Sequence, residues 1–140
     1  MKIFDYFLKD YPLSCCCIVT LWILCLMPIP DTPLSSVRLI DKWTHCVMYA
    51  GLTALLWAEY GWKHQEAGKQ GRPWTKKKLW LYGFVAPLVM GALIEIVQAT
   101  CTGGRRSGDL LDFVADSFGV LWGLVIGIPL ATMLSRRNKD

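Results

Sequence analysis

The sequence lacks the short signatures that identify most common catalytic and cofactor sites. No P-loop, nucleophile elbow or HExxH zinc motif occurs in its 140 residues. None of the six cysteines forms a C-x-x-C pair, and five lie within apolar runs, so we interpret them as small hydrophobic side chains. A disulfide framework is therefore not expected. Internal repeats and low-complexity tracts are also absent, so the positions of the polar residues carry the functional information.

The composition favours a membrane protein. Hydrophobic residues make up 54% of the chain, and its length of 140 residues fits a single domain. Seven Trp and five Tyr suit the lipid headgroup zone, where amphipathic rings are favoured. The net charge of +4 comes from basic residues that lie between apolar runs and form no continuous patch. We therefore expect no nucleic-acid partner, and a lipid bilayer with anionic headgroups instead.

Four apolar runs predict an all-α fold, a four-helix transmembrane bundle in which residues 1–140 form one domain. The predicted helices cover about residues 13–29, 43–59, 79–100 and 110–134. Each run is close to the ~20 residues that cross a hydrocarbon core of ~30 Å. The first is expected to be retained, because no small-x-small cleavage pattern follows it. Pro87, between Gly83 and Gly91, predicts a bend in the third helix.

The distribution of basic residues predicts the orientation. Eleven of the fifteen Lys and Arg residues lie in the N-terminal leader, the loop between the second and third helices, and the C-terminal tail. With four spans these segments share one side, and the positive-inside rule makes that side the cytoplasm. Both termini are therefore expected to be cytoplasmic, in a multi-pass protein of the inner (plasma) membrane. The other two loops face outward.

Three polar stretches meet at the outer end in this topology. Placing an ionisable side chain at membrane depth costs free energy, so its presence there indicates a function. Helical spacing also places Asp41 with His45, Glu95 with Gln98, and Asp109 with Asp112 and Asp116 on a common face. The residues are Asp41, Lys42 and His45 in the second helix, Glu95 and Gln98 in the third, and Arg106, Asp109, Asp112 and Asp116 in or before the fourth.

The acidic stripe of the fourth helix continues into a glycine stripe. Gly119, Gly123 and Gly127 form a G-x-x-x-G-x-x-x-G pattern in line with Asp112 and Asp116. Such a pattern lets helix backbones approach closely in lipid. A helix packs on its small-residue face, so both carboxylates are predicted to point into the bundle.

The cluster allows three interpretations. In the first it is a structural network, with Lys42 paired to Glu95 and Arg106 paired to Asp109 or Asp112. In the second, His45 with Asp116, Asp112 or Glu95 supplies nitrogen and oxygen ligands to a metal, although the spacing matches no recognised metal motif.

The third interpretation is an acid–base site that acts on a lipid-linked or envelope substrate. His45 titrates near neutrality, and a neighbouring carboxylate can orient its other ring nitrogen. Arg105 and Arg106 follow Gly103 and Gly104 and can hold a phosphate or carboxylate. The residue types that such a site needs are present at plausible positions.

These motifs resemble the VanZ-like family of small bacterial membrane proteins. That family combines D-K-x-x-H, E-x-x-Q and R-x-x-[DS]-x-x-D-x-x-x-N-x-x-G, and residues 41–127 carry all three parts. Asp116 stands where the pattern has asparagine, which adds a potential charge. The resemblance implies a cell-envelope role, since the family is named for a protein associated with resistance to the glycopeptide teicoplanin. It implies no particular reaction.

The resulting functional hypothesis is an outward-facing site that recognises or modifies an envelope or lipid-linked component, with a link to glycopeptide resistance implied by the resemblance. The alternative is a non-enzymatic scaffold or small transporter-like bundle with a structural network. Neither a cofactor nor a metal ligand is assigned, and whether the chain is an enzyme stays open. The predicted catalytic residues are His45 and its expected carboxylate partners, Glu95 and Asp112. The predicted substrate-binding residues are Asp41, Lys42, Gln98, Arg106, Asp109 and Asp116.

Overall fold

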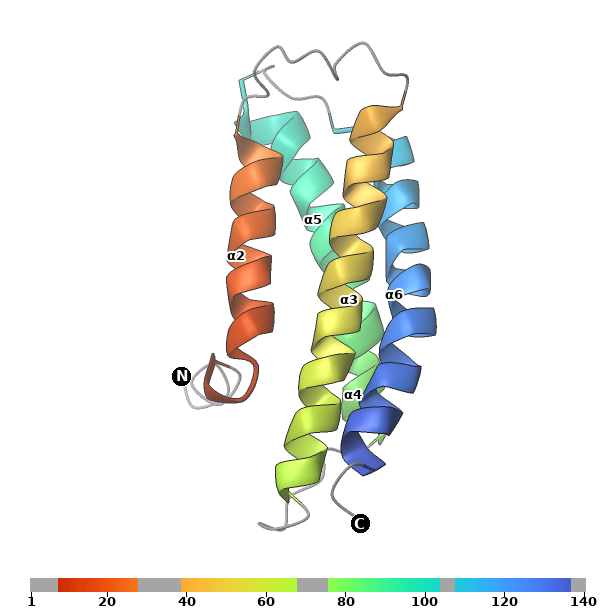
Figure 1. The fold of residues 1–140 in the computed structure, drawn as a ribbon. Coiled ribbons are helices and arrows are strands. Elements are labelled where there is room, and N and C mark those ends of the chain that lie inside the picture. Colours follow the sequence, from red (N-terminus) through yellow and green to blue (C-terminus); the bar gives the residue numbers. More distant parts are fainter. Residues whose placement is uncertain (1–7, 28–38, 68–75, 104–107, 137–140) are drawn as a thin grey trace.

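The computed structural model describes residues 8–27, 39–67, 76–103 and 108–136, and the secondary structure in these ranges is helical (Figure 1). The prediction of an all-α fold is therefore confirmed. The elements are α2 (Pro12–Leu26), α3 (Ile40–Ala67), α4 (Lys76–Trp80), the π-helical turn η2 (Leu81–Val85), α5 (Ala86–Cys101) and α6 (Leu110–Arg136).

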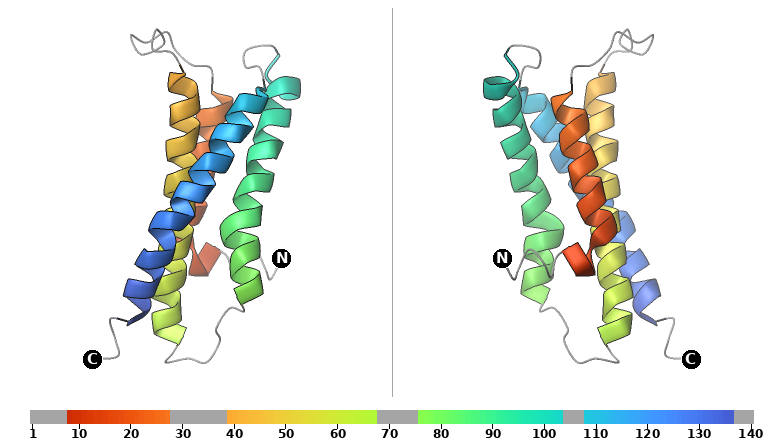
Figure 2. Two further views of the ribbon diagram at one scale, coloured as in Figure 1. Left: turned by 90° about the vertical axis from the view of Figure 1, so that its right-hand side faces the viewer. Right: turned by 90° about the vertical axis from the view of Figure 1, so that its left-hand side faces the viewer.

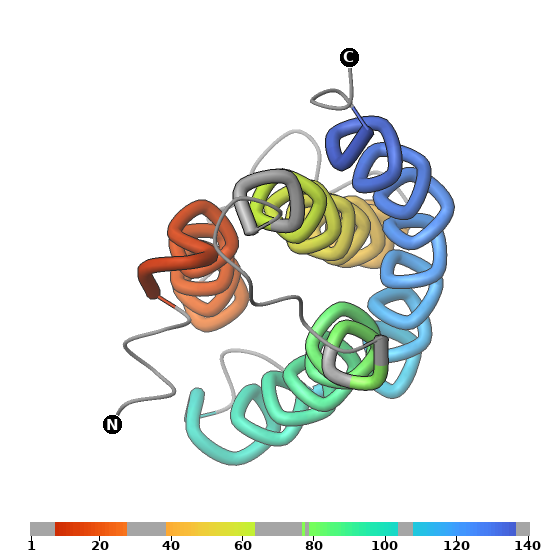
Figure 3. The backbone as a smooth tube through the Cα atoms, turned by 90° about the horizontal axis from the view of Figure 1, so that it is seen from below, coloured from red at the N-terminus to blue at the C-terminus, as the bar shows by residue number. Residues whose placement is uncertain are grey.

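The long helices lie side by side around a common interior. Seen along the bundle (Figure 3), α3 lies between α2 and α6, and α5 closes the ring between α6 and α2. The largest interface joins α3 and α6, which cross at an angle in the side views (Figure 2). We call the end at which α3 and α6 begin the polar end; α2 and α5 finish there too (Figure 1).

The boundary of the second predicted helix was wrong. It was expected to end near Glu59, but α3 continues to Ala67. The prediction followed hydropathy, which falls after Glu59, whereas a helix continues for as long as its backbone hydrogen bonds do. Lys63 lies in this extension and approaches Asp10, with 3.9 Å between the charged atoms.

The glycine stripe of α6 packs directly on α3. A Cβ atom added to Gly123 would lie 2.5 Å from the Cβ of Thr53, and one added to Gly127 would lie 2.8 Å from the Cβ of Trp57. At Gly119 it would collide with the carbonyl oxygen of Cys46. The close helix approach predicted from the G-x-x-x-G pattern is present, and it orients the acidic stripe of α6.

Pro87 lies at the start of α5, directly after the π-helical turn. Because proline has no N–H, it cannot donate to the carbonyl four residues earlier, that of Gly83. The indole Nε1 of Trp57 on α3 donates to that carbonyl instead, over 3.3 Å. A Cβ on Gly83 would lie 2.8 Å from the indole nitrogen, so glycine makes this contact possible.

The described helices expose apolar side chains and bury polar ones. Large exposed hydrophobic residues include Leu13, Val19, Ile23, Val47, Val89, Leu93, Ile96, Phe118, Trp122, Val125 and Met133. The buried polar residues are Ser14, His45, Thr53, Glu59, Glu95, Gln98, Thr102, Asp112 and Asp116. This is the reverse of the usual distribution in a water-soluble protein.

Two helical segments in the described ranges are long and apolar enough to cross a membrane. They are Leu81–Cys101, with 21 residues, and Leu110–Arg136, with 27 residues. The apolar helix α2 is shorter, at 15 residues. Length and composition of this kind also occur in core helices of soluble proteins, so these two segments indicate membrane association without establishing the number of spans.

Candidate functional site

The structure brings the three predicted polar stretches together at the polar end. They come from the first turns of α3, the last turns of α5, and the first turns of α6 with the residue before it. Arg105 and Arg106 lie outside the described residues. The predicted site residues that are described form two layers: an outer layer of Asp41, Lys42, Asp109 and Asp112, and an inner layer of His45, Glu95, Gln98 and Asp116.

Lys42 is the centre of the outer layer. Its Nζ lies 2.7 Å from Asp109 Oδ2, 2.6 Å from Asp112 Oδ1 and 3.8 Å from Asp41 Oδ2. The predicted pairing of Lys42 with Glu95 was wrong, because the start of α6 approaches the start of α3 and brings two aspartates to the amine. The hydrogen bond from Lys42 lowers the pKa of the Asp109 carboxyl below its ordinary value. Lys42 and Asp109 remain partly exposed, so this layer is accessible.

Asp109 connects three elements. Its Oδ1 accepts a hydrogen bond from the backbone N–H of Leu111 over 2.9 Å and so caps the first turn of α6. Its Oδ2 accepts a hydrogen bond from Nζ of Lys42. Its own backbone N–H donates to Oε2 of Glu95 on α5 over 2.7 Å. Gly108 permits this approach, since a Cβ there would collide with the carbonyl oxygen of Glu95.

His45 and Asp116 form the centre of the inner layer. The His45 Nδ1 and Asp116 Oδ1 atoms are 2.9 Å apart, and the side chains are 2% and 0% exposed. The expected carboxylate partners of His45 were Glu95 and Asp112. The hydrogen-bond partner is Asp116, one turn deeper on α6 than Asp112, which is held by Lys42 instead. With the proton on Nδ1, the Nε2 atom of His45 is left as an acceptor.

Gln98 makes hydrogen bonds that join helices. Its side-chain Nε2 donates to the backbone carbonyl of Cys25 over 2.7 Å and so ties α5 to the last turn of α2. Its backbone carbonyl accepts the Thr102 hydroxyl, also over 2.7 Å. Gln98 is only 1% exposed, so its side chain makes a structural contact and is less accessible than the outer layer.

Several buried oxygen atoms of the inner layer have no hydrogen-bond partner among the described residues. They are Glu95 Oε1, Asp116 Oδ2 and the hydroxyl of Tyr49. Asp116 Oδ2 lies against α5, since a Cβ on Gly91 would be 2.8 Å from it and 3.4 Å from the Tyr49 hydroxyl. Unpartnered buried oxygens are rare and call for an explanation.

Tyr49 was missed by the sequence-based prediction. It lies one helical turn beyond His45 and is completely buried. The signal was available, because the His45–Tyr49, Gly91–Glu95 and Asp112–Asp116 pairs each have a spacing of four on their own helix. A tyrosine in an apolar helix is, however, usually interpreted as an interfacial anchor.

Glu59 was also missed. Its carboxylate, 9% exposed, accepts the backbone N–H groups of Leu13 and Ser14 over 2.9 and 3.0 Å, and also the Ser14 hydroxyl. These donors are the free N–H groups at the start of α2, where a negative charge is stabilised by the helix dipole. Glu59 therefore caps α2 from α3, at the end of the bundle opposite the polar end.

Two groups of side chains have the donors and the spacing to hold a metal ion. Asp41, His45 and Asp112 form one group, and His45, Glu95 and Asp116 form the other; in each, the candidate ligand atoms lie within 4.8 Å of one another. The second group is entirely buried.

Comparison of the chain with protein-family models, curated proteins and solved structures finds no match. The function therefore has to be argued from the arrangement of the residues themselves.

Proposed function

We propose that the chain is a four-helix membrane protein of the bacterial inner membrane, related to the VanZ-like family. Its exposed apolar faces support the membrane assignment. Val47 on α3 and Val125 on α6 are 67% and 64% exposed, while Asp116 is fully buried. A bilayer gives such faces a favourable solvent, whereas water does not. The relation to the VanZ-like family rests on the three polar motifs.

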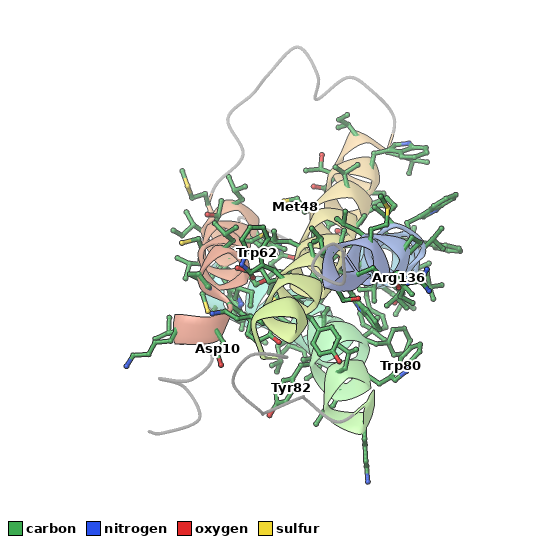
Figure 4. The ribbon with its side chains drawn as sticks, turned by 60° about the horizontal axis from the view of Figure 1, so that its bottom comes forward. Asp10, Met48, Trp62, Trp80, Tyr82 and Arg136 are labelled. Carbon is green, nitrogen blue, oxygen red and sulfur yellow. The ribbon has the colours of Figure 1, made fainter. Side chains whose placement is uncertain are left out.

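In this proposal the polar end faces away from the cytoplasm. The basic residues that determine the orientation include Lys63 and Arg136, which belong to the opposite end of the bundle. Trp62, Trp80 and Tyr82 lie on the elements of that end together with Arg136 (Figure 4). Aromatic and basic side chains at one level suit a membrane interface.

The proposed activity of the polar end is recognition or modification of an anionic envelope component or lipid-linked substrate. The single observation that carries it is the buried His45–Asp116 pair directly beneath the partly exposed Lys42 layer. Arg106 is the residue expected from the sequence to hold an incoming anion, because Lys42 is already paired with Asp109 and Asp112. The carboxylate of Asp116 orients the imidazole, so Nε2 of His45 can accept or deliver a proton.

The test is replacement of His45 by alanine in cells that depend on this chain. Val47→Ala, on the outward face of the same helix, is the matched control. Because loss of the His45–Asp116 pair also destabilises the fold, the phenotype is compared at matched membrane levels of each variant. We expect only His45→Ala to change an envelope phenotype such as glycopeptide susceptibility at matched levels. An unchanged phenotype with normal accumulation of His45→Ala would contradict the proposal.

A structural network is the second candidate function. It is favoured by the contacts that join helices pairwise: Lys42 with Asp112, Asp109 with Glu95, and Gln98 with Cys25. In a scaffold of this kind, membrane accumulation falls when any of these contacts is removed. The His45→Ala experiment distinguishes the two functions at matched membrane levels, because a scaffold then keeps the phenotype and a site loses it.

A further inference from the structure

We propose that His45, Glu95 and Asp116 bind a divalent cation of the Zn²⁺ or Mn²⁺ class inside the bundle. One imidazole nitrogen and carboxylate oxygens from two acids are ligands that both ions accept. The proposal deepens the function proposed for the polar end and rests on it for its biological meaning. Cation binding itself can be measured without any envelope substrate.

The three side chains already have nearly the required spacing. Their candidate ligand atoms lie within 4.8 Å of one another, and His45 Nδ1 is 2.9 Å from Asp116 Oδ1. Two ligands bound at ~2.1 Å lie ~3.0 Å apart in an octahedral arrangement and ~3.4 Å apart in a tetrahedral one. The His45–Asp116 separation is therefore close to that of two ligands on one ion, with Glu95 as the third. An ion bound at Nδ1 replaces the proton there, so the imidazole then carries its proton on Nε2, which can deliver it.

Two buried carboxylate oxygens are available as ligands. Glu95 Oε1 and Asp116 Oδ2 have no hydrogen-bond partner among the described residues, and the side chains are 9% and 0% exposed. A carboxylate oxygen buried in this way is unfavourable unless a positive charge or a donor satisfies it. A cation between the two carboxylates satisfies both.

The charges of the inner layer lead to the same conclusion. The amine of Lys42 is held by Asp109 and Asp112 in the outer layer, so it does not neutralise Glu95 or Asp116. When both carboxyl groups are ionised and the imidazole is neutral, the three side chains carry a charge of about −2, which one divalent cation cancels. The other group, with Asp41 and Asp112, is less suited because Asp112 already has Lys42.

Gly91 lets Asp116 Oδ2 and the Tyr49 hydroxyl approach α5 closely. A Cβ there would lie 2.8 Å from Asp116 Oδ2 and 3.4 Å from the hydroxyl of Tyr49. The Tyr49 hydroxyl is itself unpartnered among the described residues and adds an oxygen to the wall of the site. It can bind the ion or donate to a ligating carboxylate.

The experiment is titration of the full chain, purified in detergent and stripped of metal with a chelator, with MnCl₂ and separately with ZnCl₂. Calorimetry gives the stoichiometry, and the melting temperature is followed in parallel. We expect saturable binding of one ion per chain and a melting temperature that rises with metal concentration. Glu95→Gln and Asp116→Asn, which keep the side-chain shape, should each weaken binding at least tenfold.

The matched control is Asp10→Asn, an exposed aspartate at the opposite end of the bundle, which should bind as the wild type does. If Asp116→Asn does not fold, Glu95→Gln decides the test. A folded wild-type protein that binds neither ion, or binding that survives both inner-layer substitutions, overturns the site. Failure of the envelope function is seen separately, as metal binding by a chain whose His45→Ala variant leaves the phenotype unchanged.

Discussion

The two halves of the α3–α6 interface hold the same pair of helices by different interactions. Toward the polar end, side chains bridge the helices, as in the Lys42–Asp112 and His45–Asp116 pairs. Toward the opposite end, no bridge is needed, because Gly123 and Gly127 bring the backbone of α6 against Thr53 and Trp57. Close backbone packing joins two helices in lipid without burying charge, whereas a buried charge carries a desolvation cost.

The comparison teaches that helix association alone does not require the charged half. A glycine stripe extended to the start of α6 would hold α3 with fewer buried charges. The polar half therefore carries groups that the fold could do without, which is why we assign it a function. Substitutions in each half separately test this conclusion.

The largest effect is expected from breaking the buried pair on one side only. His45→Leu leaves Asp116 buried and unpaired, which typically costs ~3–5 kcal/mol. The double variant His45→Leu with Asp116→Leu should recover most of this loss, because no uncompensated charge remains. Chemical denaturation in detergent measures both variants. If the double variant is no more stable than the single one, the fold requires the pair. That result would contradict the conclusion that α3 and α6 associate without the charged half.

The next effect tests the glycine half. Gly123→Ala should destabilise the protein by ~1–3 kcal/mol, since the new methyl group overlaps Thr53. Gly51→Ala is the matched control, because a Cβ at Gly51 meets nothing within 4 Å. The control should be neutral or stabilising by roughly 0.5–1 kcal/mol, since alanine has the higher helix propensity. Equal melting temperatures for the two variants would argue against close packing at Gly123.

A smaller effect is expected at the cap of α2. Glu59→Gln removes the charge that accepts the Leu13 and Ser14 N–H groups but keeps the shape, so a loss of about 1 kcal/mol is expected. Neither metal binding nor the envelope phenotype should change, because Glu59 lies at the opposite end from His45. Loss of metal binding in a folded Glu59→Gln protein would show that the two ends are coupled.

The smallest effect concerns pH. Lys42 lowers the pKa of Asp109 below its ordinary value of 3.8, so the ionised carboxylate is favoured in the folded state. Its contribution to stability is present above the ordinary pKa and is lost as the pH falls through the lowered folded value. The difference in melting temperature between wild type and Asp109→Asn should therefore shrink below about pH 4. A difference that grows toward low pH would contradict this assignment.

Sequence patterns were sufficient for features that depend on one helix at a time. The alignment of Asp112 and Asp116 with Gly119 and Gly123 predicts which face of α6 is buried, and both aspartates are buried. Partner choice was not predictable in the same way. Whether His45 meets Asp112 or Asp116 depends on how far α6 slides along α3, and that register is decided by packing between the helices.

Local chemistry explains the other differences. Pro87 predicts a break in regular helix geometry, but its spacing cannot reveal that Trp57 replaces the missing donor at Gly83. Glu59 looks like the polar end of an apolar run, and its capping of α2 depends on a contact between residues 45 positions apart. The orientation in the membrane stays a prediction.

The apolar layer beneath the inner site determines how the site can be used. One turn below Asp116 on α6 lies Val120, and beside it are Leu52 and Leu56 of α3, all almost entirely buried. A hydrated ion or a proton that enters past Lys42 therefore meets dry hydrocarbon after the first turns of α6, where its solvation is lost. In the conformation described, this layer separates the polar end from the opposite end of the bundle. A carrier that moved an ion or proton through the bundle would therefore have to repack this layer in every cycle.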